Sequence, residues 1–131
     1  MSSHVNFVVA TGLCGVILCN ASHAQTPAAF DLMEATIEGI HAAMKAGSLS
    51  CVELVEGYLA RIKAYDQVGP KLNAIQNVHP AAVASAAELD AKLKRGGPLG
   101  RLHCIPVLVK DQIETSFMPT TYGSVLFKTD P

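Results

Sequence analysis

The fold is decided by the stretch Gly97-Pro-Leu-Gly-Arg-Leu-His-Cys-Ile-Pro-Val-Leu-Val-Lys-Asp-Gln112. Within it, an apolar run from Ile105 to Val109 lies between a loop containing Gly and Pro and the charged pair Lys110 and Asp111. Such a run predicts a buried strand of an α/β sheet. Because functional groups gather just beyond the carboxyl ends of strands in these sheets, Lys110 is a candidate catalytic residue. The alternative is an ordinary hydrated lysine at a strand end.

The same stretch resembles the sequence around the catalytic lysine of the amidase signature family, in which G-P-L-H-G-I-P-V-x-V-K-D-N is typical. Met118-Pro-Thr-Thr-Tyr-Gly-Ser124 resembles the M-P-T-T-x-G-S run that follows in that family. Two positions depart from the pattern, since Cys104 stands where glycine is commoner and Gln112 where asparagine is commoner. The resemblance covers roughly residues 30–131, and its upstream part includes 49–55 and 58–62, similar to the first helical hairpin, and 72–75, similar to the first strand.

This resemblance implies an α/β fold, made of the amino-terminal helical hairpin, the first strands and one helix of a mixed-sheet amidase signature fold, incomplete at this length. It implies a hydrolase that acts on non-peptide C–N bonds of a small-molecule amide by a Ser–Ser–Lys mechanism without a cofactor. The family's serines lie in a Gly- and Ser-rich segment, and no G-G-S-S-G-G-like run occurs in these 131 residues. The chain is therefore expected to be inactive alone. The alternative is a non-catalytic binding or scaffold remnant of an amidase.

In this scheme Lys110 is the general base, and it must be neutral before it can accept a proton. We expect burial against the apolar run to favour the neutral amine. A carboxylate next to the amine would oppose this, but successive side chains of a strand point to opposite faces, so Asp111 is expected to face away. Asp111 is therefore expected to accept hydrogen bonds from loop amides.

Thr121 and Ser124 are candidate supporting residues of the same site. Their hydroxyls either satisfy local backbone groups in a turn or form a hydrogen bond toward the lysine. The resemblance places Ser124 in the loop that flanks the site rather than in the role of nucleophile.

The histidines and cysteines show no metal-ligand spacing, so no metal site is predicted. His103 and Cys104 are adjacent, and in an extended chain their side chains point in opposite directions, which also argues against a Cys–His catalytic pair. Cys51 and Cys104 can pair in an oxidising compartment, but free buried thiols are the expected state.

Residues 1–24 contain no Asp, Glu, Lys or Arg. The apolar run from Phe7 to Cys19 is too short to cross a bilayer as a helix but suits the core of a signal peptide. Ser22 and Ala24 provide small residues for cleavage before Gln25. Export to the periplasm or medium is therefore predicted, the alternative being a buried amino-terminal helix.

The predicted domains are thus a cleaved signal peptide, 1–24, and a truncated amino-terminal part of an amidase domain, 25–131. The net charge of −1, without a basic stripe, predicts neither a nucleic acid partner nor, after cleavage, a membrane partner. The oligomeric state is left open.

Capping patterns define the expected helices. Asp31 with Glu34 predicts the start of the first helix and Gly47 its end, while Ser50 with Glu53 predicts the start of the second. Pro80 predicts the first residue of a third helix, which ends at 95–98. A strand is predicted over 72–78. The expected buried positions are Met33, Ile37, Ile40 and Met44 in the first helix, Val52, Val55, Leu59 and Ile62 in the second, and Ala82, Ala86, Leu89 and Leu93 in the third.

Overall fold

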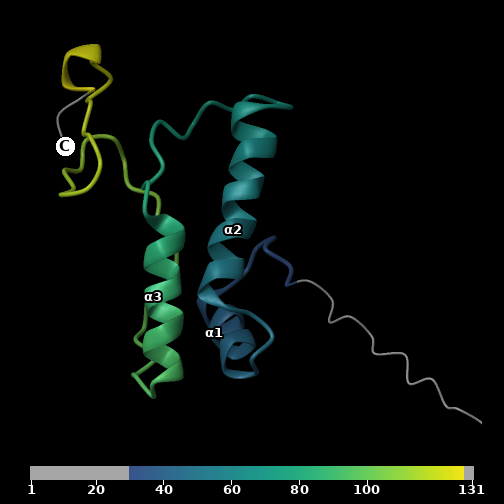
Figure 1. The fold of residues 1–131 in the computed structure, drawn as a ribbon. Helices are drawn as coiled ribbons and strands as arrows, with labels where there is room; N and C mark the ends of the chain where they lie inside the picture. The colour runs from purple at the N-terminus through teal and green to yellow at the C-terminus, as the bar shows by residue number, and fades with distance from the viewer. Residues whose placement is uncertain (1–29, 129–131) are drawn as a thin grey trace, which may run out of the picture.

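The computed structural model describes residues 30–128, and the predicted signal peptide lies outside this range. Helices α2 and α3 lie side by side as a pair, and α1 lies beside the first turns of α2 (Figure 1). No described helix has the length and apolar character that a membrane span needs. The elements are the α-helices α1 (Ile37–Lys45), α2 (Cys51–Arg61) and α3 (Ala82–Lys94), the π-helix η1 (Ile62–Gln67) and the 3-10 helix η2 (Val125–Phe127).

Helix α1 starts later than the sequence pattern indicates. Its N-cap is Thr36, whose hydroxyl accepts a hydrogen bond from the backbone N–H of Gly39 at 3.0 Å. The prediction of a capping box from Asp31 to Glu34 is wrong, because Asp31 instead accepts the N–H of Met33 and Glu34 has a φ of 53°. The helix ends as expected before Gly47, whose φ of 71° is a conformation that glycine adopts without strain.

Helix α2 confirms the predicted start. The Ser50 hydroxyl accepts the backbone N–H of Glu53 at 3.1 Å, and the Glu53 carboxylate accepts the N–H of Ser50 at 2.7 Å. These bonds lower the pKa of Glu53, the bond from the Ser50 hydroxyl contributing most. The fully buried residues of the helix are Cys51 and Leu54, whereas the four predicted apolar positions of the second helix are only half-buried.

Helix α3 begins two residues after Pro80 and ends at Lys94, before Gly96 with a φ of 79°. Ala86 is buried, so the small side chains expected on this face let the helix pack closely on α2. The Asp90 carboxylate accepts the backbone N–H groups of Cys51 at 2.8 Å and of Val52 at 3.2 Å. A side chain of α3 therefore satisfies two of the donors that the first turn of α2 leaves free.

The two predicted strands, 72–78 and 105–109, are not formed in the described part of the chain. Asn73 has a φ of 50°, which interrupts an extended conformation in the first segment. In the second segment Val107 and Leu108 are 67% and 77% exposed rather than buried. A strand needs a neighbouring strand to satisfy its backbone groups, and these two segments do not pair with each other.

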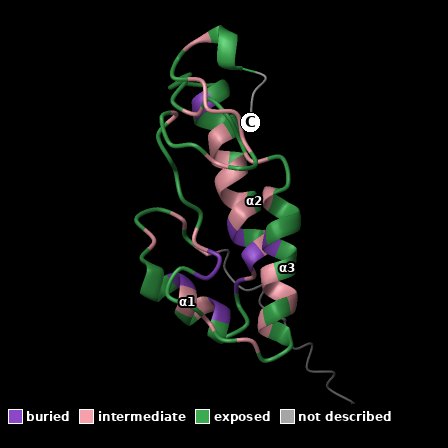
Figure 2. Cartoon of the chain, turned by 90° about the vertical axis from the view of Figure 1, so that its left-hand side faces the viewer, coloured by how far each residue is buried: buried purple, intermediate pink, exposed green. Residues whose placement is uncertain are grey.

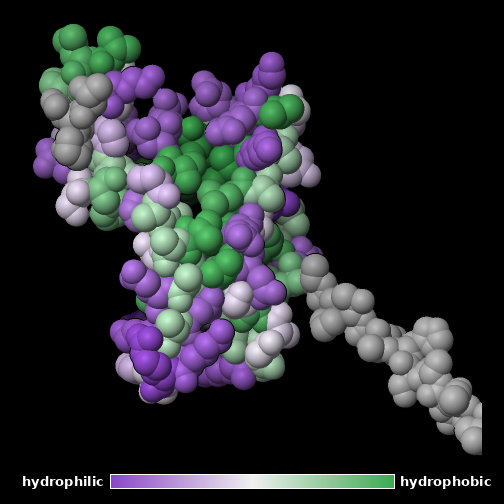
Figure 3. Space-filling model, in the orientation of Figure 1, coloured by the Kyte–Doolittle hydropathy of each residue, from purple (hydrophilic) through white to green (hydrophobic). Residues whose placement is uncertain are grey.

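The core lies where α1, α2, α3 and the turn at 101–104 meet (Figure 2). A disulfide joins Cys51 to Cys104 with a Cα–Cα distance of 5.3 Å, which corrects the expectation of free thiols. Hydrophobic side chains remain exposed along the seam between α2 and α3 and at η2 (Figure 3). The buried core residues are Ile40, Met44, Leu49, Cys51, Leu54, Ala86 and Cys104.

Candidate functional site

A cavity of about 340 Å³ lies beside Lys110 and Asp111. Both segments that the sequence predicts as strands contribute to its lining, so they lie close together although they form no ladder. The lining is mostly apolar, and Lys110 and Asp111 are its only charged residues. The lining consists of Ala74, Ile75, Gln76, Asn77, Leu108, Val109, Lys110, Asp111, Ile113, Thr115, Met118 and Pro119.

Lys110 lines this cavity, but its side chain is exposed in the described chain. The expected burial against the apolar run is not found, because Val107, Leu108 and Val109 are themselves exposed. The backbone carbonyl of Lys110 accepts the N–H of Ile113 at 2.9 Å, which forms a turn directly after the lysine. This turn starts the segment that returns toward Asp111.

Asp111 ties that segment together, as the sequence predicted. Its carboxylate accepts the backbone N–H of Thr121 at 2.9 Å and of Gly123 at 3.4 Å, and it also accepts the Thr121 hydroxyl. Its backbone carbonyl accepts the N–H of Tyr122 at 3.2 Å. The hydrogen bonds from Thr121, first the hydroxyl and then the N–H, lower the pKa of Asp111 because they favour the charged carboxylate.

The structure assigns different local roles to Thr121 and Ser124. Thr121 donates its hydroxyl to Asp111, the direct neighbour of Lys110 in the chain. The Ser124 hydroxyl accepts the N–H of Leu126 at 3.2 Å and caps η2. Within residues 30–128 neither hydroxyl is hydrogen-bonded to the lysine, so the turn role is the one observed for both.

Asp66 is a structural residue of the site that the sequence analysis missed. It lies in η1, is only 6% exposed, and its carboxylate accepts the backbone N–H of Ala74 at 2.6 Å and of Ile75 at 3.3 Å. Its backbone carbonyl accepts the N–H of Asn73 at 3.1 Å. Asp66 therefore fixes the wall that Ala74 and Ile75 contribute to the cavity. A helical Asp shortly before a Gly-Pro break was the available signal.

His103 and Cys104 are also arranged differently from the prediction. Both are buried, and His103 Nε2 lies 3.9 Å from Cys51 Sγ. The expectation of opposed directions is wrong because the chain is a turn here and Cys104 has a φ of 60°. The alternation rule holds only for extended chain. A positive φ also explains why glycine would suit this position.

The comparison with known proteins places these motifs in a family. The profile of the amidase family matches residues 53–131, a range that includes the cavity residues from Ala74 onward and the turn held by Asp111. The chain belongs to the amidase family.

Individual relatives agree with this. The chain is 42% identical over 90 residues to a glutamyl-tRNA(Gln) amidotransferase of Chloroflexus aggregans, covering 68% of this chain and 18% of the relative. It is 37% identical over 108 residues to a probable amidase of Arabidopsis thaliana, covering 80% and 20%. The chain thus spans about a fifth of the length of these relatives.

Solved structures extend the similarity to the fold. The structure of native peptide amidase from Stenotrophomonas maltophilia superposes with a TM-score of 0.71 at 38% sequence identity, covering 73% of this chain and 20% of that one. An amidase family protein from Bacillus anthracis superposes with a TM-score of 0.68 at 36% identity, covering 72% and 19%. The helical arrangement of the described residues is therefore that of an amidase-family fold.

Proposed function

We propose that this chain is the amino-terminal portion of an amidase that hydrolyses the C–N bond of a small carboxylic amide, with Lys110 as the general base. The observation that carries the proposal is the contact between two family motifs. Asp111 of the lysine motif binds Thr121 and Gly123 of the M-P-T-T-Y-G-S motif at the edge of the cavity that Lys110 lines. Two segments typical of amidases are thereby held around one candidate base.

The proposed chemistry is acyl transfer through a Ser–Ser–Lys arrangement. The neutral amine of Lys110 accepts a proton as a serine attacks the amide carbonyl, and the resulting acyl-enzyme is then hydrolysed by water. Both serines are proposed to come from chain beyond these residues, since the chain spans about a fifth of its relatives. The isolated chain is therefore expected to have no activity.

The neutral state of the base requires that water be excluded from the amine. In the described chain Lys110 is exposed, and so are the apolar residues Val107, Leu108 and Val109 before it. We infer that the rest of an amidase domain covers this run and takes it up as a strand of a mixed sheet. Burial of three such side chains favours that docking by about 1.5–3 kcal/mol each.

A chimera tests the proposal. Residues 53–128 of this chain replace the matching segment of the Stenotrophomonas maltophilia peptide amidase, and hydrolysis of a chromogenic amide is measured. Turnover is expected, and Lys110→Ala should lower kcat by roughly 10²–10⁴-fold, the usual contribution of a general base. Lys94→Ala is the matched control, because Lys94 is an exposed lysine at the end of α3.

Two results would contradict the proposal. A folded chimera that keeps its turnover after Lys110→Ala would remove the lysine from the mechanism. A folded chimera without any turnover would favour the non-catalytic remnant instead. Hydrolysis by the 131-residue chain alone, above the rate in buffer, would contradict the proposed origin of the serines.

We also propose that the protein is exported. The support is the disulfide between Cys51 and Cys104, because disulfides persist mainly in oxidising compartments. Expression with the native amino terminus in a bacterial host tests this. The protein recovered from the periplasm or medium should have the mass of a chain beginning at Gln25, and an uncleaved protein confined to the cytoplasm would refute export.

A further inference from the structure

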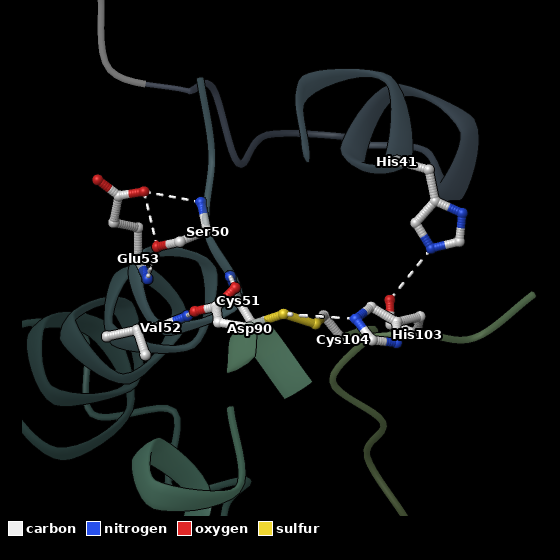
Figure 4. The surroundings of a disulfide bond; sticks show 8 residues. All are labelled: His41, Ser50, Cys51, Val52, Glu53, Asp90, His103 and Cys104. Atoms are coloured by element: carbon white, nitrogen blue, oxygen red, sulfur yellow. Dashed lines mark hydrogen bonds between the residues drawn. A yellow bond between two sulfur atoms is a disulfide. The ribbon is translucent and has the colours of Figure 1, made fainter. Parts of the chain in front are cut away.

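Three potential metal-ligand atoms meet in the core next to α2. They are the Sγ atoms of Cys51 and Cys104 and the Nε2 atom of His103, and all lie within 4.8 Å of one another (Figure 4). The three residues are 0%, 6% and 8% exposed, so the cluster is shielded from bulk water. In the structure the two sulfur atoms form a disulfide, and the imidazole stands beside it.

The backbone around the cluster is held by contacts other than the disulfide. Cys51 is the first residue of α2, and its N–H is bound by Asp90. The carbonyl of His103 accepts a hydrogen bond from Nε2 of His41 in α1 at 3.1 Å, and the N–H of His103 binds the carbonyl of Gly100 at 3.0 Å. Cleavage of the disulfide therefore leaves the three side chains anchored on positioned backbone.

We propose that the reduced chain binds Zn²⁺ through Cys51 Sγ, Cys104 Sγ and His103 Nε2. With Zn–S distances of about 2.3 Å and Zn–N distances of about 2.0–2.1 Å, a tetrahedral site places sulfur and nitrogen ligands about 3.6 Å apart. The observed separation of Cys51 Sγ and His103 Nε2 is 3.9 Å. This pair already has nearly the spacing that the ion requires.

The two sulfur atoms must separate to about 3.8 Å in such a site. Rotation about the side-chain bonds of Cys104 provides this while the Cα atoms keep their 5.3 Å distance. Three protein ligands leave the fourth position of the ion to a water molecule. Two thiolates and an imidazole are the donors that zinc takes in proteins, and a buried thiolate pair gains more from a cation than an exposed one.

The chemical steps balance with a thiol reductant. Two thiol equivalents cleave the disulfide by exchange, giving the Cys51 and Cys104 thiols and the oxidised form of the reductant. Binding of Zn²⁺ then displaces the two thiol protons to solvent, while His103 coordinates as the neutral imidazole. The disulfide and the zinc site are mutually exclusive states of the same two sulfur atoms.

The test uses the full chain in a Cys14→Ser, Cys19→Ser background, which leaves only the two core cysteines. Zn²⁺ affinity is measured by competition with a chromogenic chelator at neutral pH, with and without a phosphine reductant. We expect one Zn²⁺ per reduced chain and at least 100-fold weaker binding by the oxidised chain. Co²⁺ added to the reduced chain should give the thiolate-to-cobalt absorption of a tetrahedral site.

His103→Gln separates the proposed site from two cysteines alone, because this variant still forms the disulfide and its fold can be checked in the oxidised state. It should weaken Zn²⁺ binding by at least roughly 10–100-fold, the range seen even for loss of residues that only support a metal ligand. His79→Gln is the matched control, since His79 stacks on Phe117 away from the cluster.

Circular dichroism of the reduced chain guards against binding by unfolded thiols. Zn²⁺ should raise the unfolding temperature of the reduced chain and leave that of the oxidised chain unchanged. The proposal is overturned if the reduced chain binds no more tightly than the oxidised one. Binding that is unaffected by His103→Gln overturns it equally, whether or not the reduced chain is folded.

Discussion

Loss of the disulfide between Cys51 and Cys104 should strongly destabilise the fold, and the cost can be worked out from the structure. The bond closes a loop across 53 residues. In the chain-entropy model, opening a loop of that length lowers the free energy of unfolding by about 4 kcal/mol. That is a large fraction of the 5–15 kcal/mol typical of a domain.

The conformation of Cys104 partly offsets this cost. Its φ of 60° lies in the left-handed region, which costs a residue with a Cβ about 1–2 kcal/mol. Cys104→Gly and Cys104→Ala both remove the disulfide, but only glycine relieves this strain. Because glycine also makes the unfolded chain more flexible, by about 0.4–1 kcal/mol, Cys104→Gly should be the more stable variant by about 1 kcal/mol or less.

Urea unfolding followed by far-ultraviolet circular dichroism measures both effects. The oxidised chain, the reduced chain and the two variants are compared with Cys14 and Cys19 replaced by serine and with a chelator present. The expected order of stability is oxidised chain, then Cys104→Gly, then Cys104→Ala. Equal midpoints for the oxidised and reduced chains would refute the entropic reasoning, and a more stable Cys104→Ala would refute the role assigned to φ.

Three other changes test local interactions. Asp66→Ala should lower stability by about 1.5–3 kcal/mol, because charged hydrogen bonds are lost, and should speed hydrogen exchange at Ala74; unchanged exchange would contradict its role in the cavity wall. Thr121→Val should raise the pKa of Asp111 toward its ordinary 3.8 in a carboxyl NMR titration. Because that pKa is lowered in the folded chain, the contribution of Asp111 is present above 3.8 and is lost as the pH falls below it, and a variant with the same titration would refute this. Ser50→Ala should cost about 1 kcal/mol in thermal unfolding, and no loss would contradict the capping box.

Local signals in the sequence predicted the parts of the fold that depend on neighbouring residues. The capping box at Ser50, the glycine after α1 and the glycine after α3 each act within a few residues, and each prediction is confirmed. The start of α1 was wrong for a local reason as well. Asp31 uses its carboxylate on the N–H two residues ahead, which leaves the cap to Thr36.

The strands depended on partners that the chain does not contain. An apolar run such as 105–109 indicates burial, but burial needs a second surface, and these residues are exposed here. The exposure of Lys110 has the same cause. Asp111 was predicted correctly as an acceptor of loop amides, because a carboxylate among Gly and Thr residues finds its donors nearby.

The core cluster was missed because its geometry depends on one backbone angle. Cys104 was noted as standing where glycine is commoner, and that substitution was the readable sign of a left-handed residue. Applied at this position, the sign would have cancelled the alternation argument for His103. It would not have indicated Cys51 as the neighbour, since 53 residues separate the two cysteines.

The clamp of Asp90 on the first turn of α2 has a consequence for a polypeptide growing on the ribosome. The box between Ser50 and Glu53 can close as soon as those residues emerge, because both partners are made almost together. The N–H of Cys51 must stay hydrated until the acceptor 39 residues later is synthesised. The second helix thus begins with half of its terminus satisfied, and the nascent chain completes it only when the third helix docks.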